Sequence, residues 1–167
     1  VAEARKAGAT VVEQPTNRGY IAALKRGFRE ADTGVVVTYD ADGEHRPEDV
    51  RRVAEPIDTH GLDLVLGARS QIPRPSERLL NRLTGLKVPV SDSGTGLRAL
   101  RRDLAVELEL DTVCTCGTLV LEATAKGARI GEVPIETREI DKPRSIAWGH
   151  ARQLLHVVRY LRKVQVY

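Results

Sequence analysis

The sequence predicts an α/β fold in which a mostly parallel sheet is flanked by helices. Two short apolar runs, residues 35–39 and 62–67, have the length and the β-branched content of strands. Helix signals lie before, between and after these runs, and such alternation favours parallel strands with helices on the sheet faces. The chain has 167 residues and 41% hydrophobic side chains, which suffices for one core and is too little for two. Residues 1–167 are therefore expected to form a single domain.

The order of elements follows from the apolar periodicity and the turn residues. The expected strands occupy residues 10–14, 35–39, 62–67 and 129–137. The expected helices occupy residues 1–8, 18–31, 47–56, 77–86, 101–110, 117–127 and Ile146–Lys163. Residues 35–39 lack the alternation of a half-exposed strand, so we expect a central parallel strand covered on both faces. Pro47 suits the first position of a helix, and Pro56 is expected to end that helix.

Charge and hydropathy limit the classes of partner. Lys and Arg number 26 against 23 for Asp and Glu, spread along the chain, so the net charge of +3 gives no support for nucleic-acid binding. No run approaches the roughly 18 consecutive apolar residues of a membrane span, and no signal-peptide pattern is present, so a cytoplasmic location is expected. The last helix either lies on a membrane surface or packs on its own domain. Its apolar face consists of Leu154, Leu155, Val158 and Leu161.

The two cysteines, Cys114 and Cys116, are separated by one residue. An intrachain disulfide over this spacing is strained, and two thiols are too few ligands for a zinc site. We therefore expect ordinary reduced thiols in the core.

The turn after residues 35–39 carries closely spaced carboxylates. Asp40 and Asp42 follow the strand directly, and Glu44 lies two residues further on. In an open α/β sheet ligands bind beyond the carboxyl ends of the strands, and two such carboxylates can share a hard cation that also bridges diphosphate oxygens. A Mg²⁺ or Mn²⁺ site is therefore expected here, and a solvated turn is the plain alternative.

Several motifs occur in a fixed order along the chain. They are Asn17-Arg18-Gly19-Tyr20, Asp40-Ala41-Asp42-Gly43-Glu44, Gly67-Ala68-Arg69, Asp92-Ser93-Gly94-Thr95-Gly96-Leu97-Arg98 and Ile130-Gly131-Glu132-Val133-Pro134-Ile135. Together they resemble the inverting family 2 glycosyltransferases of the GT-A (Rossmann-like) fold. The resemblance is greatest to the polyprenol-phosphate (dolichol-phosphate) mannosyl- and glucosyltransferase-like branch. The first strand of that family should precede Val1, so we expect the fold to be N-terminally incomplete.

The resemblance implies a metal-dependent transfer of a sugar, with inversion, from a UDP- or GDP-sugar to an acceptor such as a polyprenyl phosphate. It implies Asp40, Asp42 and Glu44 as metal ligands and Asp92 as the catalytic carboxylate on the acceptor side. Asp92 would act as a general base towards a sugar hydroxyl, whereas an ionised lipid phosphate needs only positioning. The implied substrate-binding residues are Asn17, Gly19, Ala41, Arg69, Thr95, Gly96, Arg98, Glu122, Arg138, Lys142, Arg144 and Ser145.

Two alternative functions are left open by the sequence. A haloacid-dehalogenase-like phosphatase would use Asp40 as nucleophile and Asp42 as acid or base, but the later acidic pair that such enzymes need is not found. A metal- or partner-binding module of the same fold, without catalysis, would follow if the nucleoside pocket is missing. Ile21 and the segment around Cys114 and Cys116 depart from the family pattern.

Overall fold

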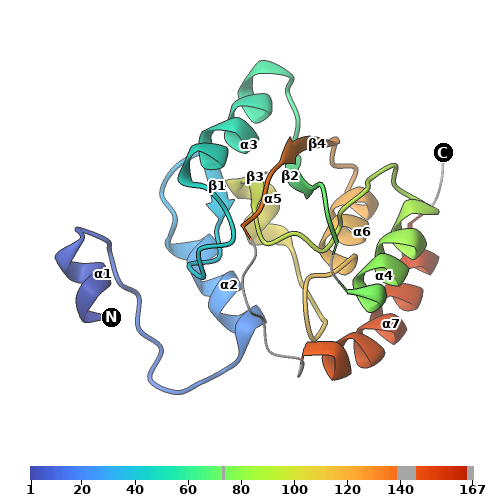
Figure 1. Ribbon diagram of the computed structural model, residues 1–167, viewed down its shortest axis with the longest axis horizontal. Coiled ribbons are helices and arrows are strands. Elements are labelled where there is room, and N and C mark those ends of the chain that lie inside the picture. Colours follow the sequence, from blue (N-terminus) through green and yellow to red (C-terminus); the bar gives the residue numbers. More distant parts are fainter. Residues whose placement is uncertain (73, 139–145, 165–167) are drawn as a thin grey trace.

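The computed structural model describes residues 1–72, 74–138 and 146–164 (Figure 1). Its strands are β1 (Val35–Thr38), β2 (Leu64–Arg69), β3 (Arg98–Arg101) and β4 (Ile130–Ile135). Its helices are α1 (Ala2–Lys6), α2 (Tyr20–Glu30), α3 (Pro47–Thr59), α4 (Pro75–Gly85), α5 (Arg102–Glu107), α6 (Thr118–Ala125) and α7 (Ile146–Lys163). Among the described residues, no helix is both long and apolar enough to cross a bilayer.

The strands form one mixed sheet in the order β1-β3-β2-β4. β3 pairs antiparallel with both β1 and β2, and β2 pairs parallel with β4. β1, β2 and β4 therefore point the same way, and β3 runs against them. Because β1 and β2 are parallel in direction, their carboxyl ends lie at the same edge of the sheet, where the chain entering β3 also arrives.

Several predicted elements need correction. Residues 10–14 form no strand. β3 was missed because it has only four residues, and the helix predicted over residues 101–110 begins at its last residue, one position before α5. α3 continues through Pro56 to Thr59, since Val53 and Ile57 on either side of the proline are fully buried. That packing outweighs the cost of a proline in a helix, which is about 3 kcal/mol.

The first strand also differs from its prediction. Within the described part of the chain, β1 is an edge strand with β3 as its single neighbour. All of Val35–Thr38 are half-buried rather than buried on both faces. The apolar run therefore correctly predicted a strand. The prediction that this strand lies in the centre of the sheet was wrong for the described part of the chain.

Two apolar clusters cover the two faces of the sheet. Leu64 and Leu66 of β2 point into the larger cluster with α2, α4, α5, α6 and α7, while Val65 between them points to the smaller cluster with α3. This is the alternation that a pleated strand requires. In Figure 1, α3 lies on one side of the sheet, and α1 stands apart from it and has no buried residue.

The last helix packs on the domain with a face shifted from the predicted one. Its fully or almost fully buried side chains are His150, Gln153, Val157 and Tyr160. These positions recur at helical spacing and face α4 and α6. Two members of the predicted apolar face, Leu155 and Val158, are exposed instead, because Gln153 and His150 occupy the buried side.

Candidate active site

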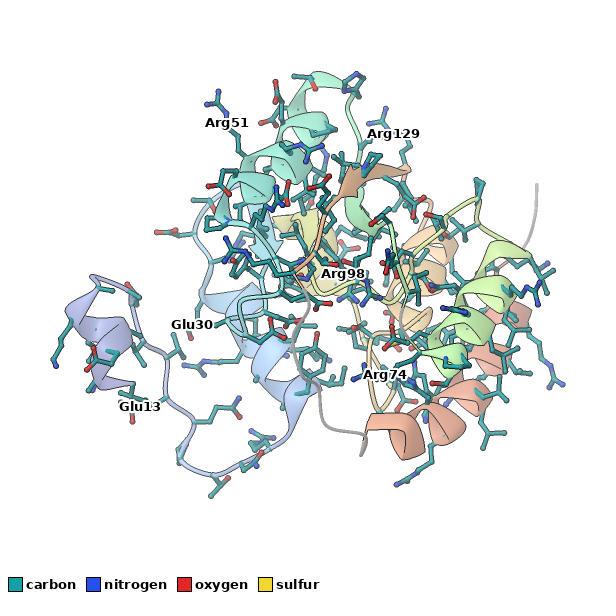
Figure 2. The ribbon with its side chains drawn as sticks, in the orientation of Figure 1. Glu13, Glu30, Arg51, Arg74, Arg98 and Arg129 are labelled. Atoms are coloured by element: carbon teal, nitrogen blue, oxygen red, sulfur yellow. The ribbon has the colours of Figure 1, made fainter. Side chains whose placement is uncertain are left out.

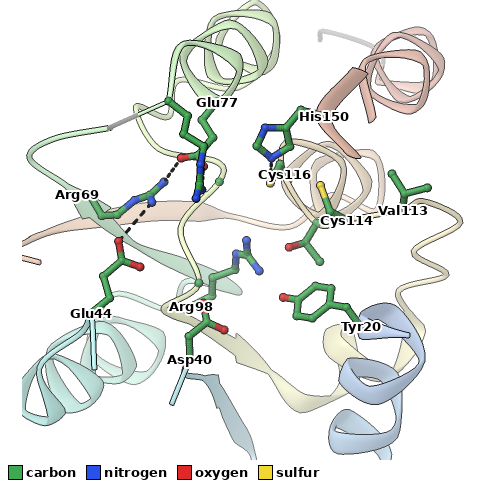
Figure 3. A pocket seen from close by; sticks show the side chains of 14 residues that line it. Tyr20, Asp40, Glu44, Arg69, Glu77, Arg98, Val113, Cys114, Cys116 and His150 are labelled. Atoms are coloured by element: carbon green, nitrogen blue, oxygen red, sulfur yellow. Dashed lines mark hydrogen bonds and ion pairs between the residues drawn. The ribbon is translucent and has the colours of Figure 1, made fainter. Parts of the chain in front are cut away.

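A cavity of about 320 Å³ lies at the edge of the sheet where β1 and β2 end (Figure 3). Its walls come from the start of α2, the turn after β1, the end of β2, the first turn of α4, the loop and first residue of β3, the loop before α6, and α7. Six of the fourteen described residues that line the cavity carry a charge. The cavity thus occupies the position at which open α/β sheets bind ligands.

Asp40 reaches this cavity because the end of β1 is fixed to the loop before β3. The Thr38 hydroxyl donates a hydrogen bond of 2.7 Å to the carbonyl of Gly96. The Asp40 carboxylate packs so closely on this loop that a Cβ at Gly96 would lie 2.0 Å from Asp40 Oδ2. Any side chain at position 96 would have to displace the Asp40 carboxylate, so two motifs that are far apart in sequence form one surface.

The rest of the predicted metal loop is arranged differently. Asp42 is exposed and its Oδ1 accepts a hydrogen bond of 3.0 Å from the backbone of Glu44, in a turn that Gly43 completes with a φ of 84°. Glu44 is buried, and its Oε1 lies 3.8 Å from Arg69 Nη1. Among the described residues, Asp40, Asp42 and Glu44 do not gather their oxygens around one point. Two carboxylates still suit Mg²⁺ or Mn²⁺, since these ions take their remaining ligands from water and phosphate.

Arg69, at the end of β2, is the centre of a buried ion-pair network. Its Nε and Nη2 hold both carboxylate oxygens of Asp92, at 2.7 and 3.0 Å, and Nη2 also lies 3.1 Å from Glu77. Arg74 binds the second oxygen of Glu77 at 2.8 Å. This bidentate geometry fixes the Arg69 guanidinium at the cavity wall.

Asp92 is fully buried behind Arg69 and does not line the cavity. Besides Arg69, its Oδ1 accepts hydrogen bonds from Asn81 and from the backbone of Gly94, at 3.4 and 3.3 Å. Burial raises the pKa of Asp92, but the hydrogen bonds and charge of Arg69 outweigh burial and leave the pKa lowered. A buried carboxylate with a lowered pKa is a poor proton acceptor, so the geometry disfavours the general-base role and favours positioning of Arg69.

Glu132, in the Ile130 to Ile135 motif, holds the same loop from the other side. Its carboxylate accepts hydrogen bonds from the backbone of Ser91 at 2.9 Å and of Asp92 at 3.0 Å. β4 therefore positions the loop that carries Asp92. This contact gives a structural reason for the Ile130 to Ile135 motif to occur together with the Asp92 to Arg98 motif.

Arg98, the first residue of β3, is 1% exposed and lines the cavity. Figure 2 shows it inside the molecule, whereas Arg51 and Arg129 project outwards. In the described part of the chain, Nε and Nη1 of Arg98 have no hydrogen-bond partner. Figure 3 shows its guanidinium between Asp40 and Cys114. A buried guanidinium with unsatisfied donors is costly, and an anionic ligand would supply its missing acceptors.

Of the predicted substrate-binding residues that the structure describes, some line the cavity and some do not. Arg69, Gly96 and Arg98 line the cavity. The cavity walls do not include Asn17, Gly19, Ala41, Thr95, Glu122 or Arg138. Lys142, Arg144 and Ser145 lie outside the described residues.

Two of the predicted residues that do not line the cavity, Glu122 and Asn17, have a clear structural role. Glu122 is buried and accepts hydrogen bonds from the backbone of Glu109 and Leu110 and from the Tyr160 hydroxyl. It therefore anchors a loop and α7 rather than a substrate. Asn17 Oδ1 accepts a hydrogen bond of 2.9 Å from the backbone of Gly19, which forms the turn before α2. Tyr20, the next residue, is the member of this motif that reaches the cavity.

Arg138 is exposed, but its backbone N–H donates a hydrogen bond of 2.9 Å to the carbonyl of Glu44. The segment after β4 therefore passes beside the turn that carries Asp42. This contact brings the backbone of Arg138, one of the predicted substrate-binding residues, beside the predicted metal loop.

Sequence reasoning missed part of the cavity wall. The missed side chains are Tyr20, Arg74, Glu77, Val113, Cys114, Thr115, Cys116 and His150. Tyr20 stood within a recognised motif and could have been included. His150 gave no signal, because it follows Cys116 by 34 positions and only the packing of α7 brings it near.

The mixed sheet, with a cavity of buried cations and carboxylates at its edge, defines an α/β domain of the kind whose ligand sites lie beyond the carboxyl ends of its strands. The sequence signature of Glycosyl transferase family 2 matches residues 1–117. The chain belongs to this family, which confirms the resemblance and removes the dehalogenase-like alternative.

Individual relatives agree with this assignment. The chain is 34% identical to the dolichyl-phosphate hexose transferase of Haloferax volcanii over 149 residues, 81% of this chain and 64% of that protein. It is 31% identical to the UDP-N-acetylglucosamine–dolichyl-phosphate N-acetylglucosaminyltransferase of Methanococcus voltae over 133 residues, 70% of this chain and 53% of that protein. The chain thus spans less than two thirds of the length of either relative.

The fold has solved counterparts. The chain is similar to glucosyl-3-phosphoglycerate synthase of Mycobacterium tuberculosis in its complex with Mn²⁺, UDP-glucose and phosphoglyceric acid. The TM-score is 0.80 at 20% identity, over 95% of this chain and 63% of that one. This likeness confirms the predicted GT-A fold.

Proposed function

We propose that this chain is the catalytic part of an enzyme that transfers a sugar, with inversion, from a nucleoside-diphosphate sugar to a polyprenyl phosphate. The observation that carries the proposal is Arg98, a buried guanidinium at the cavity with two nitrogens that have no hydrogen-bond partner among the described residues. Arginine offers paired donors that match phosphate oxygens. The relatives of Haloferax volcanii and Methanococcus voltae are both named for transfer to a dolichyl phosphate, which is such an acceptor.

The state of Asp92 supports a phosphate rather than a hydroxyl as the acceptor. A sugar hydroxyl must lose a proton during transfer, whereas a lipid phosphate is already ionised near neutral pH. Asp92 is bound to Arg69 and its pKa is lowered, so it is poorly suited to take a proton. An acceptor that needs no base fits this site better.

Asp40 and Asp42 are the residues that would hold a Mg²⁺ or Mn²⁺ ion. Such an ion supplies Lewis-acid stabilisation of the charge that develops on a leaving diphosphate. Arg138 would approach the same phosphates, and the hydrogen bond from its backbone N–H to the carbonyl of Glu44 supports this role. Arg69 and Arg98 lie deeper in the cavity and would hold the acceptor phosphate.

A lipid acceptor also requires an apolar surface near the cavity. Leu79 and Leu86, on and just after α4, are 49% and 72% exposed, and Leu155 and Val158 of α7 are 74% and 39% exposed. α4 and α7 pack against each other, and both contribute side chains to the cavity wall. We propose that these two helices rest on the cytoplasmic face of a membrane, as a peripheral contact.

A second candidate function is binding without catalysis. It is favoured by β1, which has a neighbour on one side only among the described residues and is half-buried. A nucleoside site that depends on further strands beside β1 would then be incomplete in this chain. In that case the chain would bind phosphate or metal without transferring a sugar.

The test is a transfer assay on the purified chain with Mn²⁺, labelled UDP- and GDP-sugars and a short polyprenyl phosphate. Label that moves into the organic phase as an acid-labile lipid product supports the proposal. Calorimetry with UDP and GDP in the presence of Mn²⁺ separates the two candidates. Absence of both nucleotide binding and transfer in a folded chain would refute the enzymatic proposal, whereas nucleotide binding without transfer would favour the binding module.

A further inference from the structure

Cys114, Cys116 and His150 come together on one wall of the cavity. Their ligand atoms, two thiol sulfurs and one ring nitrogen, lie within 4.8 Å of one another, and Cys116 Sγ is 3.9 Å from His150 Nε2 (Figure 3). In the described part of the chain, no other three Cys, His, Asp or Glu side chains approach so closely. None of the three belongs to the motifs that carry the family resemblance.

The spacing of these atoms is close to that of a metal site. Zinc binds sulfur at about 2.3 Å and imidazole nitrogen at about 2.0–2.1 Å, so a tetrahedral ion holds its ligand atoms about 3.5–3.8 Å apart. The measured 3.9 Å from sulfur to nitrogen needs only a small adjustment. The sequence alone provided two thiols, which are too few, and the fold adds the third ligand.

Gln153 holds the cysteine loop in this geometry. Its fully buried side-chain amide donates hydrogen bonds of 2.8 and 2.9 Å to the carbonyls of Cys114 and Cys116. Its oxygen accepts a hydrogen bond of 3.2 Å from the backbone of Cys114. Because Gln153 lies one turn after His150 on α7, the same helix positions all three ligands.

The histidine ring is oriented from its other side. His150 Nδ1 lies 2.8 Å from the hydroxyl of Ser76 on α4. When Nδ1 carries the proton and donates it to Ser76, the lone pair of Nε2 faces the cysteines. A hydrogen bond of this kind on the far nitrogen accompanies most histidines that bind metal.

We propose that Cys114 Sγ, Cys116 Sγ and His150 Nε2 bind one zinc-type divalent cation. Thiolate and imidazole ligands select zinc and similar ions over Mg²⁺ and Mn²⁺, which prefer oxygen. Three protein ligands leave a fourth position, and because all three residues line the cavity, that position faces it. The site lies across the cavity from Asp40, as Figure 3 shows, and it does not depend on the proposed transfer reaction.

The experiment is a titration of the reduced chain with Co²⁺, followed by displacement with Zn²⁺. One equivalent of Co²⁺ should produce the thiolate-to-cobalt charge-transfer band and the intense visible bands of tetrahedral cobalt, and Zn²⁺ should remove both. Cys116→Ser and His150→Gln should lose these bands while circular dichroism shows a folded chain. His156→Gln is the matched control, since His156 is half-buried on the same helix, does not line the cavity and bonds to the carbonyl of Asp111.

Two further variants make the assignment specific. Ser76→Ala should weaken Zn²⁺ binding about 10- to 100-fold, as loss of an outer partner does elsewhere. Asp42→Asn should leave the cobalt–thiolate band intact, because that carboxylate belongs to the proposed oxygen site. A folded, reduced chain without a cobalt–thiolate band overturns the proposal. So does full Zn²⁺ affinity in His150→Gln, or ready closure of a disulfide between Cys114 and Cys116 in excess Zn²⁺.

Discussion

Arg98→Met is expected to make the protein more stable and less able to bind its substrate. The wild-type Arg98 side chain is 1% exposed, and its Nε and Nη1 find no hydrogen-bond partner in the part of the chain that the structure describes. Each buried, unsatisfied donor costs about 1–3 kcal/mol, and replacement of a buried ion by an apolar residue of similar volume often stabilises a protein by about 1–4 kcal/mol. We expect a gain of about 1–2 kcal/mol, which corresponds to about 2–8 °C in Tm for a domain of this size.

The effect on ligand binding has the opposite sign. Two hydrogen bonds from a charged donor to a phosphate are worth about 1.5–3 kcal/mol each, so their loss should weaken phosphate-dependent steps by at least about 100-fold. The expected result is a large rise in KM or Kd for the polyprenyl phosphate. Thermal unfolding followed by circular dichroism measures the gain in stability. Transfer kinetics at varied concentrations of the acceptor measure the loss of acceptor binding.

Arg51→Met is the matched control, since Arg51 is exposed on α3 and projects away from the cavity (Figure 2). Arg51→Met should change neither the free energy of unfolding nor the free energy of acceptor binding by more than about 0.5 kcal/mol. If Arg98→Met lowers Tm by several degrees, the guanidinium has a stabilising role within the fold, and the inference from its unsatisfied nitrogens is wrong. If acceptor KM is unchanged in a folded Arg98→Met protein, the phosphate does not bind there.

Three further predictions test other parts of the site. Gly96→Ala should displace the Asp40 carboxylate, because its Cβ would lie 2.0 Å from Asp40 Oδ2, and should weaken Mn²⁺-dependent donor binding in calorimetry. Asp92→Asn should cost about 3 kcal/mol in denaturant unfolding, because it leaves the buried charge of Arg69 with one carboxylate fewer. Folding lowers the pKa of Asp92, so the ionised carboxylate adds to the free energy of unfolding. This contribution is complete at pH values above the ordinary pKa of an aspartate, about 3.9, and it is lost as the pH falls from there through the lowered pKa of the folded state. Leu155→Glu should reduce binding to anionic vesicles in a flotation assay without changing Tm, since Leu155 is 74% exposed.

Each of these predictions has an outcome that contradicts it. Unchanged Mn²⁺-dependent binding in Gly96→Ala would show that Asp40 is not a metal ligand. A residual activity of Asp92→Asn that stays level between about pH 6 and 8 fits a phosphate acceptor, whereas loss of one limb of a bell-shaped profile would restore the general-base role. Equal vesicle binding by wild type and Leu155→Glu would rule out α7 as the membrane contact.

The sequence by itself determined the family, the fold class and most of the elements. Local patterns predicted the metal-loop turn after β1 and the strand β4, because each depends on local chemistry such as carboxylates after an apolar strand or a β-branched run. The helical period likewise gave α2 and α7, since an amphipathic pattern is a local property.

The tertiary structure decided which of the singled-out residues meet. Asp92 has the same sequence context whether it faces a substrate or a buried arginine, and only the arrival of β2 beside its loop places Arg69 against it. Arg98 could not be recognised as unpaired from sequence, because pairing depends on every element around it. The two thiols at Cys114 and Cys116 gain a third ligand from α7, far along the chain, and sequence spacing carries no information about such a contact.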